Sequence, residues 1–107
     1  MTFSFHPAAR SELDQAVNYY EACEPGLGYE FLEEVYATIA RVVEYPEAWG
    51  QFSSRTRRCL TQRFPYSVIY QAKDGEIRIL AVAHSHQRPG YWLSRQNGDV
   101  EPGASAK

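Results

Sequence analysis

The chain has 107 residues, of which 44% are hydrophobic and 14% aromatic, and its formal net charge at pH 7 is -2. This length predicts one domain with a single core, and the hydrophobic content argues against wholesale disorder. No apolar run approaches the ~18 residues of a membrane span, and the start lacks a signal-peptide pattern. The two distant cysteines, Cys23 and Cys59, give neither a disulfide framework nor a cysteine zinc motif. We therefore expect a cytoplasmic protein that makes no membrane contact.

The small net charge conceals an uneven distribution along the chain. Residues 1–50 contain nine acidic and two basic side chains, whereas residues 51–95 contain eight basic ones and only Asp74 and Glu76 as acids. Clustered charge of one sign attracts partners of the opposite sign. The second half is therefore predicted to meet an anionic or acidic partner.

The first half predicts one strand and two helices. Two phenylalanines alternate with polar residues over 2–6, as in a short strand. Apolar residues then recur at helical spacing up to about Ala22 and again over 27–43. Glu24-Pro25-Gly26 breaks the helical pattern between them, and so short a connection predicts an antiparallel helical hairpin.

The second half predicts a loop followed by strands. Residues 48–55 have the composition of a loop, and strand patterns follow over 57–62, 66–72 and 77–83. Asp-Gly at 74–75 is a strong signal for a hairpin between the last two strands. Strict alternation would place Ile77, Ile79, Ala81 and Ala83 on one face of the last strand, and Leu80 and Val82 on the other.

This order of elements predicts an α+β fold. The helical hairpin would pack on one small sheet, formed by a three-stranded antiparallel meander with the first strand returning beside a later one. We expect residues 1–95 to form a single domain. Residues 96–107 have no apolar periodicity and are predicted to be a disordered tail.

Three segments, taken in this order, carry a resemblance to a known family. They read FSFHPAARSELDQAVNYYE, GLGYEFLEEVYATIARVVEYP and RFPYSVIYQAKDGEIRILAVAHSHQRPGYW. Over roughly residues 3–92 the chain resembles the RelE/ParE family of toxins from type II toxin–antitoxin systems, which includes plasmid stabilisation proteins. The resemblance implies a β-α-α-β-β-β fold and a small cytoplasmic toxin that forms a hetero-complex with an antitoxin encoded next to it.

Members of this family act in two ways, and the resemblance implies a choice between them. RelE-like toxins cleave messenger RNA on the ribosome, and ParE-like toxins poison DNA gyrase. The nucleases place arginines at two positions that fall here on Ser67 and near Ser85, and a tyrosine near Tyr91. Because both arginines are replaced by serine, the resemblance favours a ParE-like or non-standard toxin.

Two alternatives remain open. The first is a metal-independent endoribonuclease, ribosome-dependent or free, which needs a base, an acid and cations around the phosphate. Its catalytic residues would be His84, Arg63, Arg88 and Tyr91. The second alternative is a protein-binding module that has lost toxicity.

His84-Ser85-His86 is the most distinctive short motif. In an extended segment both imidazoles would project to the same face and could act as acid and base near neutral pH. The competing interpretation is a pair that forms hydrogen bonds at a strand end. A zinc site needs at least one further ligand, which the nearby sequence does not offer, so we expect neither a metal nor a cofactor.

A second set of residues, which shares Arg63 with the first, is predicted to bind the target or the antitoxin: Arg55, Arg57, Arg58, Arg63, His86 and Trp92. Arginine forks suit phosphates and also the carboxylates of an acidic antitoxin tail. Alternatively, the arginines pair with glutamates of the second helix. Trp92 could stack on a base or cap the edge of the core. The target would be DNA gyrase or the ribosome with its messenger RNA.

Overall fold

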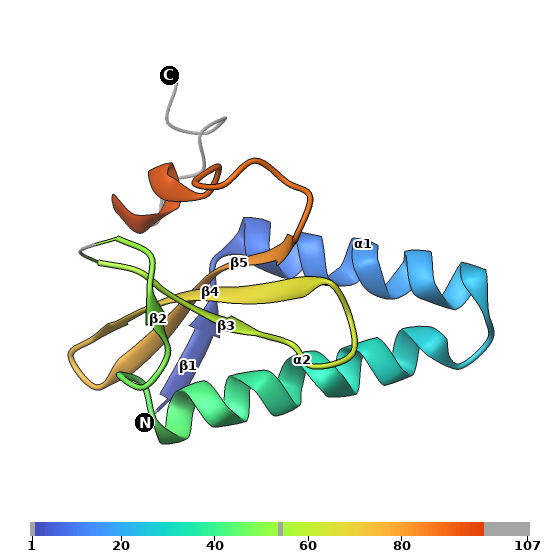
Figure 1. The fold of residues 1–107 in the computed structure, drawn as a ribbon, viewed down its shortest axis with the longest axis horizontal. Helices are drawn as coiled ribbons and strands as arrows, with labels where there is room; N and C mark the ends of the chain where they lie inside the picture. Colours follow the sequence, from blue (N-terminus) through green and yellow to red (C-terminus); the bar gives the residue numbers. More distant parts are fainter. Residues whose placement is uncertain (1, 54, 98–107) are drawn as a thin grey trace.

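A computed structural model describes residues 2–53 and 55–97 of the chain (Figure 1). The elements, in chain order, are β1 (Thr2–Phe5), α1 (Pro7–Cys23), α2 (Leu27–Glu44), β2 (Gly50–Gln51), β3 (Arg57–Leu60), β4 (Tyr66–Lys73), β5 (Glu76–His84) and the short 3-10 helix η1 (Leu93–Asn97). Two of the residues assigned to a tail, 96 and 97, thus belong to η1, and residues 98–107 lie outside the described part. None of the helices described is long and apolar enough to cross a membrane.

Over the described residues the strands form one five-stranded sheet in the order β1-β5-β4-β3-β2. β1 runs parallel to β5, and all other neighbours are antiparallel. The α+β prediction is confirmed, including the helical hairpin, the β3-β4-β5 meander and the return of the first strand beside a later one. The expected loop over 48–55 was wrong in one respect. It contains β2, whose two residues are too few for any periodicity to reveal.

In the α1–α2 hairpin, a side chain caps the N-terminal end of each helix. His6 precedes α1, where its Nδ1 accepts a hydrogen bond from the amide of Ala8 at 3.1 Å. Glu21, near the end of α1, accepts hydrogen bonds from the amides of Gly26 at 2.9 Å and Gly28 at 3.0 Å. A carboxylate from one helix thereby caps the start of the next, where amides lack partners within the helix.

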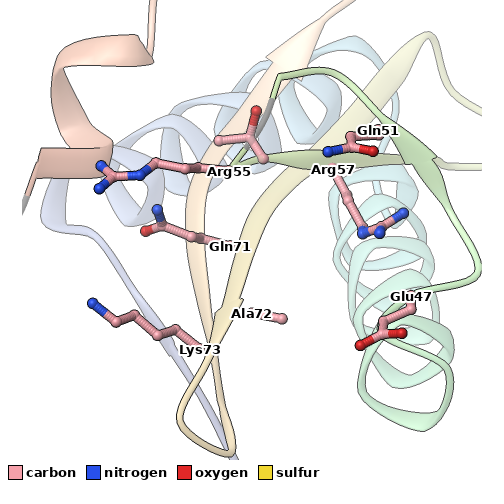
Figure 2. A pocket seen from close by; sticks show the side chains of 8 residues that line it. Glu47, Gln51, Arg55, Arg57, Gln71, Ala72 and Lys73 are labelled. Atoms are coloured by element: carbon pink, nitrogen blue, oxygen red, sulfur yellow. The ribbon is translucent and has the colours of Figure 1, made fainter.

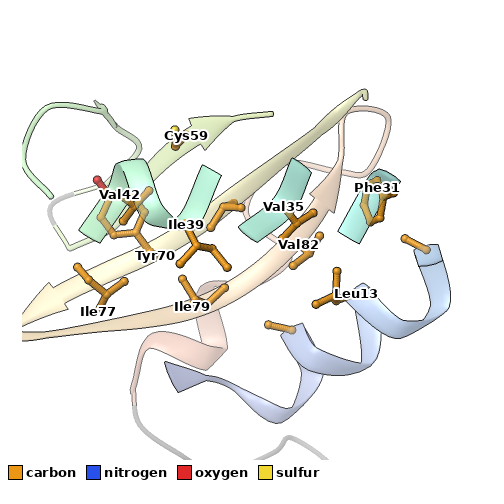
Figure 3. Close-up of a cluster of buried hydrophobic side chains, with 13 residues drawn as sticks. Leu13, Phe31, Val35, Ile39, Val42, Cys59, Tyr70, Ile77, Ile79 and Val82 are labelled. Atoms are coloured by element: carbon orange, nitrogen blue, oxygen red, sulfur yellow. The ribbon is translucent and has the colours of Figure 1, made fainter. Parts of the chain in front are cut away.

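The main core lies between the two helices and the sheet (Figure 3). Its buried members are Ala9, Leu13, Ala16, Phe31, Val35, Ile39, Val42, Cys59, Val68, Tyr70, Ile77, Ile79 and Val82. A smaller cluster on the opposite face contains Ile69, Leu80, Ala81, Ala83 and Trp92. Since β5 contributes to both clusters, both of its faces are covered, in keeping with the apolar residues that the sequence places on each face.

A β-bulge in β5 changes which residues face the helices. Pairing passes from Tyr70↔Ile79 to Ile69↔Ala81, so Leu80 is the extra residue on β5. One extra residue reverses the alternation of every side chain that follows it. The predicted grouping of Ala81 and Ala83 with Ile77 and Ile79 was therefore wrong. The residues in the helix-facing core are Ile77, Ile79 and Val82, and those on the other side are Leu80, Ala81 and Ala83.

Tyr70 joins β4 to the turn after α2, and its buried hydroxyl predicts a dependence of stability on alkaline pH. The hydroxyl donates a hydrogen bond to the carbonyl of Pro46 at 2.6 Å. Burial raises the pKa of Tyr70 to about 12, although the nearby Arg57 acts in the opposite direction. Between about pH 10 and about pH 12, an unfolded chain loses this proton while the folded one retains it, so stability falls as pH rises.

We expect urea unfolding midpoints to decrease through this window, and to decrease less in Tyr70→Phe. The variant should also lose about 1 kcal/mol near neutral pH, because the carbonyl of Pro46 loses its donor. If the urea midpoint decreases equally with pH in the parent and in Tyr70→Phe, the pKa of Tyr70 is not raised by folding.

Candidate functional site

Several of the predicted site residues meet on the face of the sheet opposite the helices. A small pocket of about 60 Å³ is found there, which we call the sheet-face pocket. Its lining comes from β3, β4, the end of β5 and the segment that follows, and comprises Arg58, Ser67, Ile69, Ala83, His84, Ser85, Gln87, Pro89, Tyr91 and Trp92. Both serines at the positions of the nuclease arginines thus face the same pocket as His84 and Tyr91.

The two histidines lie at the end of β5, but not in the predicted conformation. The strand ends at His84 and the chain turns at once, so the extended segment expected over 84–86 was wrong. The turn lets the amide of His86 donate to Nδ1 of His84 at 2.9 Å, and brings the two rings to a centroid distance of 5.0 Å. Because Nδ1 already accepts this bond, the neutral His84 ring carries its proton on Nε2. The His84 ring also lies 5.1 Å from that of Tyr66.

The two aromatic residues of the pocket are largely enclosed. The hydroxyl of Tyr91 is buried, and no hydrogen-bond partner is found for it among the described residues. Burial, reinforced by the nearby Glu12 carboxylate, raises the pKa of Tyr91 far above that of an ordinary tyrosine. Trp92 is only 3% exposed and packs on Phe52, with ring centroids 4.9 Å apart. The indole is therefore not accessible to a stacked base in this structure.

Glu12 and Arg95 hold the covering segment against β5, and we call this pair the β5 clamp. β1 pairs with β5 only as far as Ile79, and no other strand in the described part of the chain pairs with the next part of this edge. Glu12 accepts a hydrogen bond from the amide of Val82 at 3.0 Å and forms an ion pair with Arg95 at 3.1 Å. Arg95 donates to the carbonyl of Leu80 at 2.9 Å. Side chains thus satisfy the backbone groups that a strand would otherwise pair.

The remaining predicted nuclease residues do not line the sheet-face pocket. Arg63 forms an ion pair with Glu30 of α2 at 2.9 Å, with both side chains about half exposed. This is the helix pairing considered as the alternative role for the arginines. Arg88 is exposed and lines neither this pocket nor the one described next. The structure therefore brings His84 and Tyr91 together but leaves Arg63 and Arg88 out.

Arg55 and Arg57 lie at a second site, on the edge of the sheet. This sheet-edge pocket has a volume of about 400 Å³ and is lined by Glu47, Gln51, Arg55, Thr56, Arg57, Gln71, Ala72 and Lys73. Figure 2 shows Arg55, Gln71 and Lys73 pointing the same way, and Arg57 and Glu47 lying beyond Ala72. Three cations against one carboxylate make this pocket a place for a negatively charged group.

In the part of the chain that is described, no three His, Cys, Asp or Glu side chains gather in a group that could hold a metal ion. The histidine pair has no third ligand there. Neither pocket therefore presents a set of metal ligands.

Comparison with known proteins identifies the family. The model of the family described as "ParE toxin of type II toxin-antitoxin system, parDE" matches residues 3–89. The chain belongs to the ParE toxin family. It is accordingly the toxin component of a type II toxin–antitoxin system, and its partner is an antitoxin.

A solved structure shows the same fold as this ParE-family chain. It is a chain from a chromosomal ParDE toxin–antitoxin system of P. aeruginosa, with a TM-score of 0.70 and 18% sequence identity. The match covers 78% of the present chain and 95% of that chain. A search of curated proteins found no significant match.

The β5 clamp of this ParE-family toxin was missed from the sequence, although one signal for it exists. Glu12 follows Ala9 by three residues and precedes Ala16 by four, so it borders the buried stripe of α1. An acid in that position requires a partner. The partner, Arg95, lies 83 residues later in the chain, and no local pattern points to it.

Proposed function

We propose that this ParE-family toxin acts by binding its target, without cutting RNA, and that the target is DNA gyrase. The observation that carries this proposal is the composition of the sheet-face pocket. Ser67 and Ser85 line it where the related nucleases have arginines, and its volume is about 60 Å³. The choice of gyrase, and with it a cytoplasmic site of action, rests on the resemblance to ParE-like toxins.

RNA cleavage requires a base, cations and an acid, and this pocket offers a poor candidate for each of them. A base must accept the proton of the 2′-hydroxyl, but Nδ1 of His84 already accepts a hydrogen bond from His86. Cations must stabilise the phosphorane, and among the residues that the structure describes Arg58 is the sole arginine in the lining. An acid must protonate the leaving oxygen, but the raised pKa of the enclosed Tyr91 makes it a poor donor.

The cations in and beside the two pockets are the residues that we propose for target or antitoxin binding. Arg58 and His86 are exposed beside the sheet-face pocket, and Arg55 and Arg57 line the sheet-edge pocket. Arg63 also belongs to this set, although its pairing with Glu30 must be exchanged on binding. Trp92 would contribute indirectly, because its buried indole stabilises the face of the sheet that carries the sheet-face pocket.

The proposal predicts which cellular damage follows expression of the chain without its antitoxin. We expect the DNA-damage response to rise while messenger RNA stays intact, and purified chain to inhibit supercoiling by gyrase. His84→Ala should leave RNA integrity as it is in the parent, because no cleavage takes place in either. Coexpression with the neighbouring antitoxin gene is the control and should restore growth.

Two outcomes would contradict this function. RNA that is cut by the parent and spared by His84→Ala would establish the endoribonuclease. Normal growth, intact RNA and uninhibited gyrase in the presence of folded protein would identify the non-toxic binding module.

A further inference from the structure

We infer that the sheet-edge pocket binds an acidic, extended peptide segment of a partner protein, which adds to the open edge of β4. This inference does not depend on gyrase being the target. It rests on two independent features of the pocket, the backbone of Ala72 and the distribution of cations around it.

The first feature is an interruption in the pairing of β4. β3 pairs with β4 only from Leu60↔Ser67 to Arg57↔Tyr70. On the N-terminal side of Arg57, the chain leads back to β2. There the carbonyl of Thr56 accepts hydrogen bonds from the amides of Phe52 at 2.8 Å and Ser53 at 3.2 Å. Among residues 2–53 and 55–97, the end of β4 over residues 71–73 therefore has β5 on one side and no strand on the other.

The backbone of Ala72 faces this gap. The carbonyl of Tyr66 accepts a hydrogen bond from Thr61 on the β3 side, and backbone groups of a strand alternate in direction. The amide and the carbonyl of Ala72 therefore point to the same side as those of Tyr66. Over the described residues they have no hydrogen-bond partner there, and Ala72 is exposed. A strand edge with unpaired groups is a template for strand addition.

The second feature is the charge on either side of Ala72. Gln71 and Lys73 project to one face of the sheet, where Arg55 points the same way (Figure 2). Arg57 and Glu47 lie across Ala72. An added strand would place one side chain beside Ala72 and its two neighbours on the face of Arg55 and Lys73. Acidic residues at those two alternate positions would be complementary to this face.

The same two features favour a peptide over a nucleic acid. Ala72 offers both a donor and an acceptor, which a peptide backbone satisfies together. A phosphodiester oxygen only accepts, so it would leave the carbonyl of Ala72 unpaired. Glu47 would also repel a polyanion more than a peptide with two carboxylates.

The test uses the full chain and follows its backbone amides by NMR. The probe is the peptide acetyl-Thr-Glu-Val-Glu-Thr-amide, whose valine would lie opposite Ala72. The matched probes are the same peptide with both glutamates changed to glutamine, the acidic peptide N-methylated at its valine, and a decamer of thymidine nucleotides. We expect the acidic peptide to shift the amides of residues 71–73 and to bind more tightly than the other three.

Lys73→Gln should weaken the acidic peptide about threefold, in line with one exposed ion pair, and leave the glutamine peptide unchanged. Arg10→Gln is the matched control, because Arg10 is an exposed cation on α1 that pairs with Asp14, away from the pocket. Its affinity for the acidic peptide should equal that of the parent.

Several results would overturn the inference. They are unshifted amides over residues 71–73, equal binding of the acidic and glutamine peptides, equal binding of the N-methylated peptide, and equal weakening by both variants. Tighter binding of the thymidine decamer at the same amides would assign the pocket to nucleic acid instead.

Discussion

Glu12→Ala is expected to lower the free energy of unfolding by about 3 kcal/mol, since it removes one partner of a largely enclosed ion pair. The side chains of Glu12 and Arg95 are only 20% and 13% exposed, respectively. Without the carboxylate, Arg95 keeps its charge in an enclosed position and the amide of Val82 loses its acceptor. The segment carrying Tyr91 and Trp92 should then loosen from the sheet.

Urea unfolding monitored by tryptophan fluorescence would measure this loss. Asp14→Ala removes an acid two residues away, whose pair with Arg10 is more than half exposed, and should cost less than about 1 kcal/mol. Glu12→Gln retains an acceptor for the amide of Val82, so its loss of unfolding free energy should lie between those of Glu12→Ala and Asp14→Ala. If Glu12→Ala and Asp14→Ala prove equally stable, the β5 clamp contributes nothing beyond a surface pair.

Gly28→Ala is expected to destabilise the protein by about 2 kcal/mol, although alanine favours a helix more than glycine does. A Cβ at this position would lie 2.6 Å from the carbonyl oxygen of Val17 and 2.9 Å from Cβ of Glu21. The nearest atom belongs to the backbone of α1, so the helices must move apart to accept it. The gain in helix propensity is about 1 kcal/mol, which is smaller than the cost of overpacking a rigid contact.

Thermal unfolding of Gly28→Ala beside Gly50→Ala would test this. Nothing lies within 4 Å of a Cβ built on Gly50, so that variant should match the parent within about 0.5 kcal/mol. A Gly28→Ala protein at least as stable as the parent would show that the hairpin accommodates the methyl group freely.

The order of elements was predictable because each one carries its own local signal. Apolar residues at helical spacing marked α1 and α2, and Asp74-Gly75 marked the β4–β5 turn, where both residues have positive φ angles of 54° and 76°. The bulge at Leu80 carried no such signal, since one extra apolar residue in an apolar strand leaves the composition unchanged.

The candidate sites were less predictable, because they depend on residues that are distant in sequence. The resemblance to the family drew attention to Ser67 and Tyr91, and the structure places both in the lining of one pocket with His84. Sequence alone offered the pairing of arginines with glutamates of the second helix as an alternative, but could not decide that Arg63 would pair with Glu30, 33 residues before it. The sheet-edge pocket exists because β3 begins three residues short of the end of β4, which is a property of pairing register rather than of any motif.

The parallel pairing of β1 with β5 also constrains how the toxin is made. Residues 2–5 pair with residues 76–79, so β1 has no partner until β5 has also left the ribosome. Contacts of such long sequence separation are slow to form, whereas the α1–α2 hairpin is local and can form early. Until β5 has emerged, the nascent chain can therefore contain the folded α1–α2 hairpin but not the complete sheet. Toxic activity that depends on the sheet can therefore arise only after β5 has been synthesised, and an antitoxin already present can then meet each new molecule as it folds.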